Sequence, residues 1–219
     1  MPALEDGRLT VDDLIAWMLR FDEQVVAQAQ HLTALDSAIG DADHGTNMAR
    51  GTAAVRLRLT RSRPEDAGAV LKSTGMALVS TVGGASGSLY GTLFLEMGKR
   101  VGPASELDTA VVADAFRAGV AGVVARGRAE PGDKTMVDAL QPTVEALSSA
   151  AADGRPLAES LRAAAAAASV GRDATIPLVA RKGRASYLGD RSAEHLDPGA
   201  ASAAILVQAL ADSHAERAG

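Results

Sequence analysis

The sequence contains no cysteine, few aromatic residues and no long uninterrupted apolar run. None of its 219 residues is cysteine, and only 3% are aromatic. The lack of cysteine excludes disulfide bonds, thiol catalysis and zinc sites with cysteine ligands. Its apolar stretches are short or broken by glycine and charge, so none could cross a bilayer as a helix. These absences predict a soluble protein without a membrane partner.

The net charge and the length of the chain narrow the class of protein further. A formal net charge of −5 argues against a surface for nucleic acid or anionic membranes. The first residues, Met1–Asp6, lack the basic and apolar regions of a signal peptide, so we expect a cytoplasmic location. A chain of this length fits one domain, residues 1–219, with a core that needs no covalent staples.

Helical periodicity recurs along the whole chain. Apolar residues at helical spacing predict helices over residues 11–29, 32–39, 48–61, 65–79, 88–101, 108–127, 136–151, 157–170 and 200–216. Glycine and proline separate most of these segments, and no convincing alternation of apolar and polar residues marks a strand. The pattern predicts an all-α domain, a bundle of about eight helices.

Three aspartates surround a glycine turn between two predicted helices. Asp36, Asp41 and Asp43 lie in the segment LDSAIGDADHG, residues 35–45. Residues two apart on a helix point to nearly opposite sides, so their carboxylates converge only if Gly40 and Gly45 break the helix. Magnesium prefers carboxylate oxygens and the oxygens of a phosphate ligand, which makes this turn a candidate magnesium-phosphate site.

The alternatives at this turn are calcium and a purely structural role. The aspartate spacing differs from that of a helix-loop-helix calcium loop. His44 is better placed as a hydrogen-bond donor than as one of a zinc set. A helix starting just after the turn would offer unpaired amide groups, which attract phosphate. The structural alternative is a solvated acidic turn in which an aspartate caps that helix.

Two further loops have a composition suited to a ligand. The segment GGASGS, residues 83–88, is a glycine-rich turn that opens a helix, but it is neither a Walker loop nor a dinucleotide fingerprint. A tight helix–helix contact is its alternative role. The loop at residues 127–136 ends in Met136, which is able to cover an apolar ring such as adenine or to join the core.

A basic loop lies near the carboxyl end. Residues 181–189, RKGRASYLG, place three cations in an acidic protein, and Asp197-Pro198-Gly199 follows before the last predicted helix. Arginine is suited to paired contacts with phosphate, and long loops usually have a function. A solvated basic loop is the alternative.

Five motifs, taken together, carry a family resemblance. They are Gly40–Gly45 (GDADHG), Gly83–Gly87 (GGASG), Glu130–Met136 (EPGDKTM), Gly183–Gly189 (GRASYLG) and Asp197–Gly199 (DPG). Their order and identity resemble the ADP-binding L subunit of bacterial dihydroxyacetone kinase over nearly the whole chain. This resemblance implies an antiparallel barrel of eight helices with a nucleotide at one end.

The resemblance also implies roles for individual residues. Asp36, Asp41 and Asp43 would hold two magnesium ions that bridge the phosphates of ADP. Arg184 would act in phosphoryl transfer and close the site. The remaining nucleotide contacts would come from His44, Gly45, Thr46, Asn47, Ala85, Ser86, Gly127, Met136, Asp197, Pro198 and Gly199.

By resemblance, ADP in such a subunit is a bound phosphoryl carrier. A phosphohistidine donor subunit (DhaM-type) would charge it, and dihydroxyacetone on a separate substrate-binding subunit (DhaK-type) would receive the phosphate. The alternatives are the nucleotide subunit of an ATP-dependent kinase for dihydroxyacetone, a related short sugar or a fatty acid, and an ADP-sensing regulatory module without catalysis. The segment Gly183–Gly189 fits the dihydroxyacetone enzymes better than the fatty-acid kinases. Whether the subunit forms a homodimer is left open.

Overall fold

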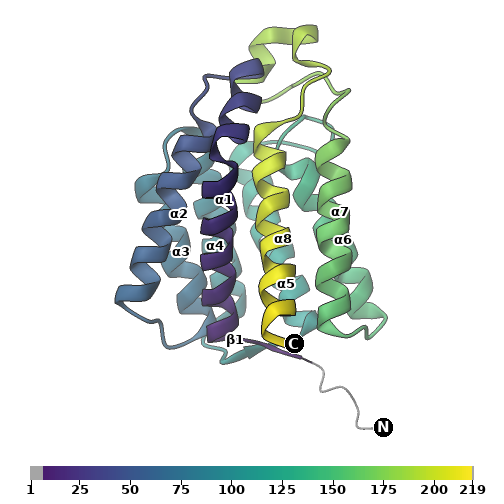
Figure 1. The fold of residues 1–219 in the computed structure, drawn as a ribbon. Helices are drawn as coiled ribbons and strands as arrows, with labels where there is room; N and C mark the ends of the chain where they lie inside the picture. Colours follow the sequence, from purple (N-terminus) through teal and green to yellow (C-terminus); the bar gives the residue numbers. More distant parts are fainter. Residues whose placement is uncertain (1–6, 219) are drawn as a thin grey trace.

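Helices form nearly the whole chain in the computed structural model, which describes residues 7–218. Within that range there are eight α-helices (Figure 1): α1 (Val11–Ile39), α2 (His44–Arg61), α3 (Ala67–Thr81), α4 (Gly84–Val101), α5 (Thr109–Gly127), α6 (Met136–Ala152), α7 (Leu157–Asp173) and α8 (Pro198–Ala218). The all-α prediction of about eight helices is confirmed. No helix in residues 7–218 combines the length and apolar character needed to span a membrane.

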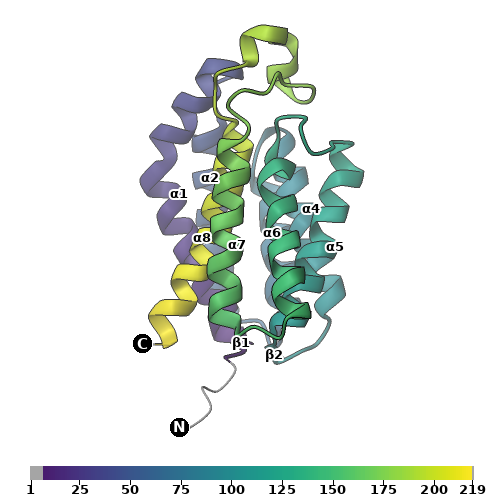
Figure 2. The ribbon, with the colours of Figure 1, turned by 90° about the vertical axis from the view of Figure 1, so that its right-hand side faces the viewer.

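The eight helices form a closed ring. Each helix packs against the next one in the sequence, and α8 packs against α1. Neighbouring helices run in opposite directions, so α2, α4, α6 and α8 all begin at the same end of the ring (Figures 1 and 2). That end also carries a 3-10 helix, η1 (Arg184–Ser192), and the opposite end carries two short strands.

Local sequence signals explain where several helices begin. Thr10 and Asp13 form a reciprocal capping box at α1. Asp66 and Asp108 cap α3 and α5 by accepting a hydrogen bond from a backbone amide three residues further on. Each cap satisfies an amide that has no partner inside its helix.

Five of the six aromatic residues gather in the core, and only Tyr187 is exposed. The Trp17 ring lies with its centroid 5.7 Å from that of Phe94 and 6.0 Å from that of Phe116. Its indole Nε1 donates a 2.8 Å hydrogen bond to the carbonyl of Leu206. One side chain therefore joins α1, α4, α5 and α8 across the middle of the ring.

The structure differs from the sequence prediction at some helix ends, since α2 begins at His44 and α4 at Gly84, and in three further places. The helices predicted at residues 11–29 and 32–39 are one helix, because no glycine or proline interrupts the chain and Leu32 is fully buried. Two-residue strands, β1 (Leu9–Thr10) and β2 (Glu106–Leu107), pair antiparallel with Leu9 opposite Leu107. The basic loop contains η1, which its sequence did not indicate.

Close packing of α3 on α4 depends on glycine. A Cβ atom added to Gly75 would lie 2.8 Å from Leu95 Cγ and 2.9 Å from the carbonyl oxygen of Gly91. We expect Gly75→Ala to lower the free energy of unfolding by about 2 kcal/mol, because the two helices must move apart. Urea denaturation measures the change. Ser80→Ala, an exposed change on the same helix, is the control, and equal stability of the two variants would contradict the prediction.

Candidate functional site

A cavity of about 410 Å³ opens at the end of the ring where the four even-numbered helices begin. Its wall includes the first residue of each of them: His44 of α2, Gly84 of α4, Met136 of α6 and Pro198 of α8. A helix amino end carries unpaired N–H groups and the positive end of the helix dipole. The cavity is therefore suited to a negatively charged ligand.

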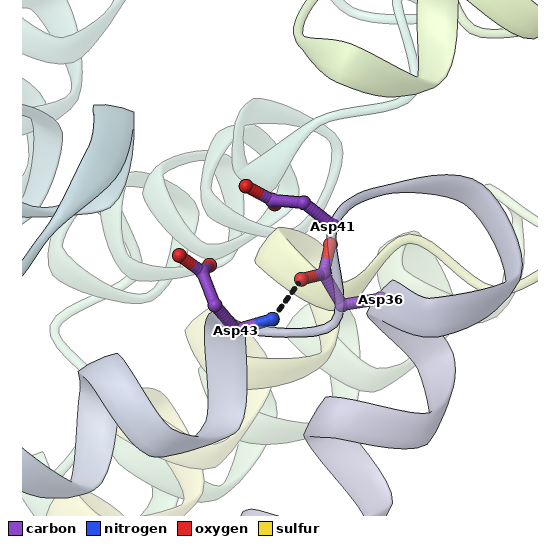
Figure 3. Close-up of side chains that lie close together, drawn as sticks. All are labelled: Asp36, Asp41 and Asp43. Atoms are coloured by element: carbon purple, nitrogen blue, oxygen red, sulfur yellow. Dashed lines mark hydrogen bonds between the residues drawn. The ribbon is translucent and has the colours of Figure 1, made fainter.

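The three aspartates of the turn meet at this cavity. One carboxylate oxygen from each of Asp36, Asp41 and Asp43 lies within 4.8 Å of the others. Asp36 is buried on the last turn of α1, whereas Asp41 and Asp43 are exposed in the connection to α2. Figure 3 shows the Asp41 and Asp43 carboxylates directed to the same side of the turn. The predicted convergence is confirmed.

Asp36 also holds the turn together. Its Oδ2 accepts a 2.9 Å hydrogen bond from the amide of Asp43 (Figure 3). It also accepts a 3.1 Å hydrogen bond from the amide of His44. Asp43 is the residue before α2, yet its side chain makes no capping hydrogen bond. An aspartate of the acidic segment therefore does cap α2, but it is Asp36, from the end of the preceding helix, and not Asp43. The carboxylates of Asp41 and Asp43 remain directed toward the cavity.

The two glycines of this segment have different functions. The chain leaves α1 at Gly40, and Ala42 adopts a left-handed conformation with φ of 61°. The expectation that Gly45 breaks a helix is wrong, because Gly45 lies inside the first turn of α2. A Cβ atom there would lie 1.9 Å from the carbonyl oxygen of Ala29. Gly45 thus allows α2 to approach α1 closely enough for Asp36 to cap it.

The glycine-rich turn leaves the amino end of α4 open. Gly83 precedes the helix without any side-chain capping bond, and Gly84, the first residue of α4, has a φ of 65°. Gly84, Ala85 and Ser86 all line the cavity. Their N–H groups are at the position where a bound phosphate is favoured.

Hydrogen bonds fix the orientation of the His44 ring. Ser202 Oγ lies 3.1 Å from the carbonyl of Gly199, 2.7 Å from Tyr90 Oη and 2.9 Å from His44 Nε2, all within hydrogen-bond distance. The other ring nitrogen, Nδ1, is hydrogen-bonded to the hydroxyl of Ser86 at 3.2 Å. A buried network of hydrogen bonds thus holds both nitrogens of the ring at the cavity wall.

Burial keeps the side chains of this hydrogen-bond network uncharged. Desolvation lowers the pKa of His44 below its ordinary value, despite the opposing effect of Asp36 and Asp43. Desolvation also raises the pKa of Tyr90, whose hydroxyl is enclosed by the bundle. Both groups are neutral near pH 7, and each is hydrogen-bonded to Ser202.

At α6 and α8, acidic side chains interact with the helix starts. Thr135 and Asp138 form a capping box at α6. Asp197, buried before α8, accepts a 2.7 Å hydrogen bond from the amide of Ala200. Burial raises the pKa of Asp197 to about 7, and the charge of Asp138 adds to the shift, while the hydrogen bonds and Lys134 oppose it.

An apolar wall and a cationic rim complete the cavity. Leu89, Val123 and Met136 contribute apolar surface, next to Gly127. At the rim, Arg184 Nε lies 3.0 Å from Asp41 Oδ2, with 70% of the arginine side chain exposed. The basic loop therefore reaches the acidic turn through Arg184. This is the position expected of an arginine that contacts phosphate.

Most of the predicted site residues share this wall. It contains Asp36, Asp41, Asp43, His44, Ala85, Ser86, Gly127, Met136, Arg184, Asp197, Pro198 and Gly199. Gly45, Thr46 and Asn47 do not belong to it: Gly45 packs on α1, and Asn47 Oδ1 accepts a 2.7 Å hydrogen bond from Arg50. Their contact with phosphate stays a prediction.

Sequence reasoning missed Tyr90, Ser202 and Lys134. Tyr90 and Ser202 read as ordinary core positions of helices, because nothing local marks their link to His44. Lys134 had a signal, since it is a lysine within the EPGDKTM motif, but its contacts come from residues 41 or more positions away.

The pKa of Asp197 predicts a pH-dependent stability. Its folded-state pKa of about 7 lies above the ordinary 3.8, so the bound proton stabilises the folded state. This contribution is complete below about pH 4 and is lost as the pH rises toward 7. We expect the stability of the wild type relative to Asp197→Asn to fall over that interval by at most about 4 kcal/mol. Urea denaturation of both ligand-free proteins tests this, and a constant difference would contradict it.

Comparisons with known proteins agree with this geometry. The model of the DAK2 domain family matches residues 38–212. The chain is 43% identical over 203 residues to the PEP-dependent dihydroxyacetone kinase, ADP-binding subunit DhaL of Escherichia coli (strain K12), covering 93% of this chain and 97% of that protein. It is also 43% identical over 199 residues to subunit DhaL of PEP-dependent dihydroxyacetone kinase 1 of Listeria innocua, covering 91% and 94%.

A solved structure is similar as well. The dihydroxyacetone kinase from C. freundii in complex with AMP-PNP and Mg2+ matches with a TM-score of 0.69 and 27% identity. The match covers 97% of this chain but only 36% of that kinase, so the chain spans about a third of its length. The resemblance drawn from the five motifs is confirmed. This protein belongs to the DAK2 domain family and groups with its ADP-binding DhaL subunits.

Proposed function

We propose that this protein is the ADP-binding subunit of a multi-subunit, phosphoenolpyruvate-dependent dihydroxyacetone kinase. One observation carries the proposal: a single cavity holds three convergent carboxylates on one side and the open amino end of α4 on the other. The first group binds divalent cations and the second binds phosphate. The cavity volume also falls within the range of about 300 to 1,000 Å³ usual for small-molecule sites.

The donor set fits magnesium. Asp36, Asp41 and Asp43 supply only carboxylate oxygens, and their oxygens lie close enough to repel one another without a cation. Magnesium commonly takes a few carboxylates and completes its coordination with water and phosphate oxygens. When bound, two magnesium ions would neutralise the charge of the ADP phosphates and of the phosphoryl group in transfer.

The remaining residues fit a nucleoside diphosphate. The amides at the start of α4, with Ser86, would hold phosphate oxygens. Met136 and Gly127, beside Leu89 and Val123, would enclose the base and ribose. Residues 197–199 would close the site from the start of α8. His44, held neutral and fixed by Ser202, would keep the Ser86 hydroxyl in position.

Arg184 would stabilise the charge that develops during transfer. Its guanidinium already lies at Asp41 on the rim of the cavity, and its exposure leaves the side chain able to turn toward a phosphoryl group. Positioning and neutralisation of charge supply most of the catalysis in phosphoryl transfer, so no protein nucleophile is needed.

The proposed assembly has two partners. A phosphohistidine protein (DhaM-type) would charge the bound ADP, and a subunit that binds dihydroxyacetone (DhaK-type) would accept the phosphate. The relatives named as ADP-binding subunits of PEP-dependent kinases support this arrangement. The solved kinase, nearly three times as long, supports a separate substrate-binding part. The proposal carries a cytoplasmic location with it.

We expect the purified protein to retain ADP and magnesium. Added Mg-ADP at about a hundred times its Kd should stabilise nucleotide-free protein by about 3 kcal/mol. Mass spectrometry of gently purified protein detects the nucleotide, and thermal unfolding with and without Mg-ADP measures the stabilisation. Protein that carries no nucleotide and gains no stability from Mg-ADP would rule out the carrier function.

Asp41→Ala and Asp43→Ala should lose magnesium binding and transfer but keep their helical content. Both residues lie in the turn, and removal of one carboxylate relieves repulsion in the apo protein. Isothermal titration with magnesium and ADP, circular dichroism and a transfer assay with the partner subunits measure these effects. Asp153→Ala, after the opposite end of α6, is the control. Transfer at the parent rate would remove the aspartates from the mechanism.

Arg184→Ala should lower the single-turnover transfer rate by about a hundredfold or more, while weakening ADP binding less. Arg184→Lys should restore only part of the rate, because lysine lacks the planar pair of donors. Arg191→Ala, from the same 3-10 helix but outside the cavity wall, is the matched control. A loss of rate that only tracks ADP affinity would instead assign Arg184 to nucleotide retention.

A further inference from the structure

Lys134 is a buried lysine that the proposed chemistry does not use. Its side chain is among the largest fully buried ones, with 1% of the residue exposed. The ammonium donates hydrogen bonds to three backbone carbonyls, of Thr175 at 2.7 Å, Ile176 at 3.2 Å and His195. An ammonium has three protons, so all its donors are occupied by the protein. Lys134 is therefore not a phosphate ligand, although it lines the cavity.

The three carbonyls belong to the two ends of one excursion of the chain. The chain leaves the ring after α7, forms a cap segment over residues 176–196, and returns at α8. Thr175 and Ile176 lie where it departs, and His195 lies where it returns. One ammonium thus joins both ends of the segment that carries Arg184. The link from Asp197 N to Thr175 Oγ1, at 3.1 Å, lies beside it.

The backbone that supports Lys134 is itself held in place. Lys134 has a φ of 63°, a left-handed conformation that costs energy for a residue other than glycine. Asp138 fixes the loop around it by accepting hydrogen bonds from the amides of Gly132 and Thr135. This strained position aims a long side chain under the cap segment, where a shorter residue could not reach both ends.

A second set of contacts joins the same loop to the cap. The amide of Arg181 donates a 3.1 Å hydrogen bond to the carbonyl of Asp133, and the two side chains approach to 3.8 Å. Within the cap, Ser192 Oγ accepts from the amide of Ala180 and donates to the carbonyl of Gly189. The cap is thus internally braced. Residues 133–134 and 175 tie it to the ring, and it also reaches the end of α1 through the Arg184–Asp41 ion pair and through Ile39, which packs with Ala180 and Ala185.

Burial lowers the pKa of the Lys134 ammonium below its ordinary value, and the nearby charges of Asp197, Glu194 and Asp138 oppose this shift. A buried cation with three carbonyl partners and nearby carboxylates costs much when removed, because the carbonyls lose their donors.

We propose that Lys134 is a positioning residue that locks the cap segment, and with it Arg184, over the cavity, so that bound nucleotide is released slowly. The part concerning ADP rests on the function proposed above. The locking of the cap does not, because it follows from contacts within this chain alone.

Trypsin gives a direct test of the lock. The cap carries four cleavage sites, at Arg181, Lys182, Arg184 and Arg191, and three of these residues are exposed. In Lys134→Met, we expect cleavage within residues 181–191 to accelerate by about tenfold or more, because local opening exposes the segment to protease. Thr143→Val is the matched control: it removes a buried hydrogen bond of α6 that does not reach the cap. Its cap should be cleaved at the wild-type rate.

The absence of cysteine allows a rescue experiment. Lys134→Cys introduces the only thiol of the chain. Alkylation of the unfolded variant with 2-bromoethylamine, followed by refolding, restores an ammonium at nearly the original distance. Alkylation with 2-bromoethanol gives a side chain of similar length without the charge. We expect the first product alone to regain slow cap cleavage. For each form, displacement of a fluorescent ADP analogue measures release, expected to be about tenfold faster when the ammonium is missing.

The outcomes separate the two proposals. Fast cap cleavage that only the ammonium reverses supports the lock, even if the wild type binds no ADP, in which case the proposed function alone fails. Wild-type cleavage in Lys134→Met, or equal rescue by both alkylating agents, overturns the lock. If Lys134→Met does not fold, the two alkylated forms of Lys134→Cys provide the same test, and equally slow or equally fast cap cleavage in both would count against the lock.

Discussion

Four helix amino ends around one cavity are the constraint on which the rest of the structure depends. An antiparallel ring with an even number of helices places every second helix start at the same end. Each start brings unpaired amides and a partial positive charge. Asp36, Asp138 and Asp197 interact with three of them, at α2, α6 and α8. At α4 no capping side chain is found in the described structure, so this end is left for a ligand.

The carboxylates at this end of the ring repel one another when no cation is bound. The carboxylates of Asp36, Asp41 and Asp43 converge, and Asp36 is already committed to two amides of α2. An arginine from the cap segment offsets part of the charge at Asp41. Such an arrangement is less stable than an ordinary helix connection, and it is understandable where a cation and phosphates supply the missing interactions.

The cap segment contributes both to the stability of the cavity end of the ring and to its proposed chemistry. Its arginine lies at the acidic turn, while its two ends are tied to the loop before α6. A segment fixed at both ends can cover a ligand without a core of its own. The strained backbone at Lys134 is consistent with a function, since strain of this kind persists where surrounding contacts impose it.

The sequence by itself determined the helices and most of the residues around the cavity. Helical periodicity, glycine and proline at the joins, and capping residues such as Thr10 and Asp13 are local signals, and the acidic turn is contained in eight residues, 36–43. Local signals failed where a contact between distant residues decided the outcome. The local sequence wrongly predicts that Gly45 breaks a helix, because its contact, the carbonyl of Ala29, lies on another helix.

Only the tertiary structure decided how the side chains of the site are held. Three contacts join residues that are 8, 158 and 61 positions apart in the sequence. They are the hydrogen bonds of Asp36 with the His44 amide, of His44 with Ser202, and of Lys134 with the His195 carbonyl. Such pairings depend on the closure of the ring, which no short segment encodes. The sequence therefore determined which groups are available, and packing of the eight helices decided which of them meet.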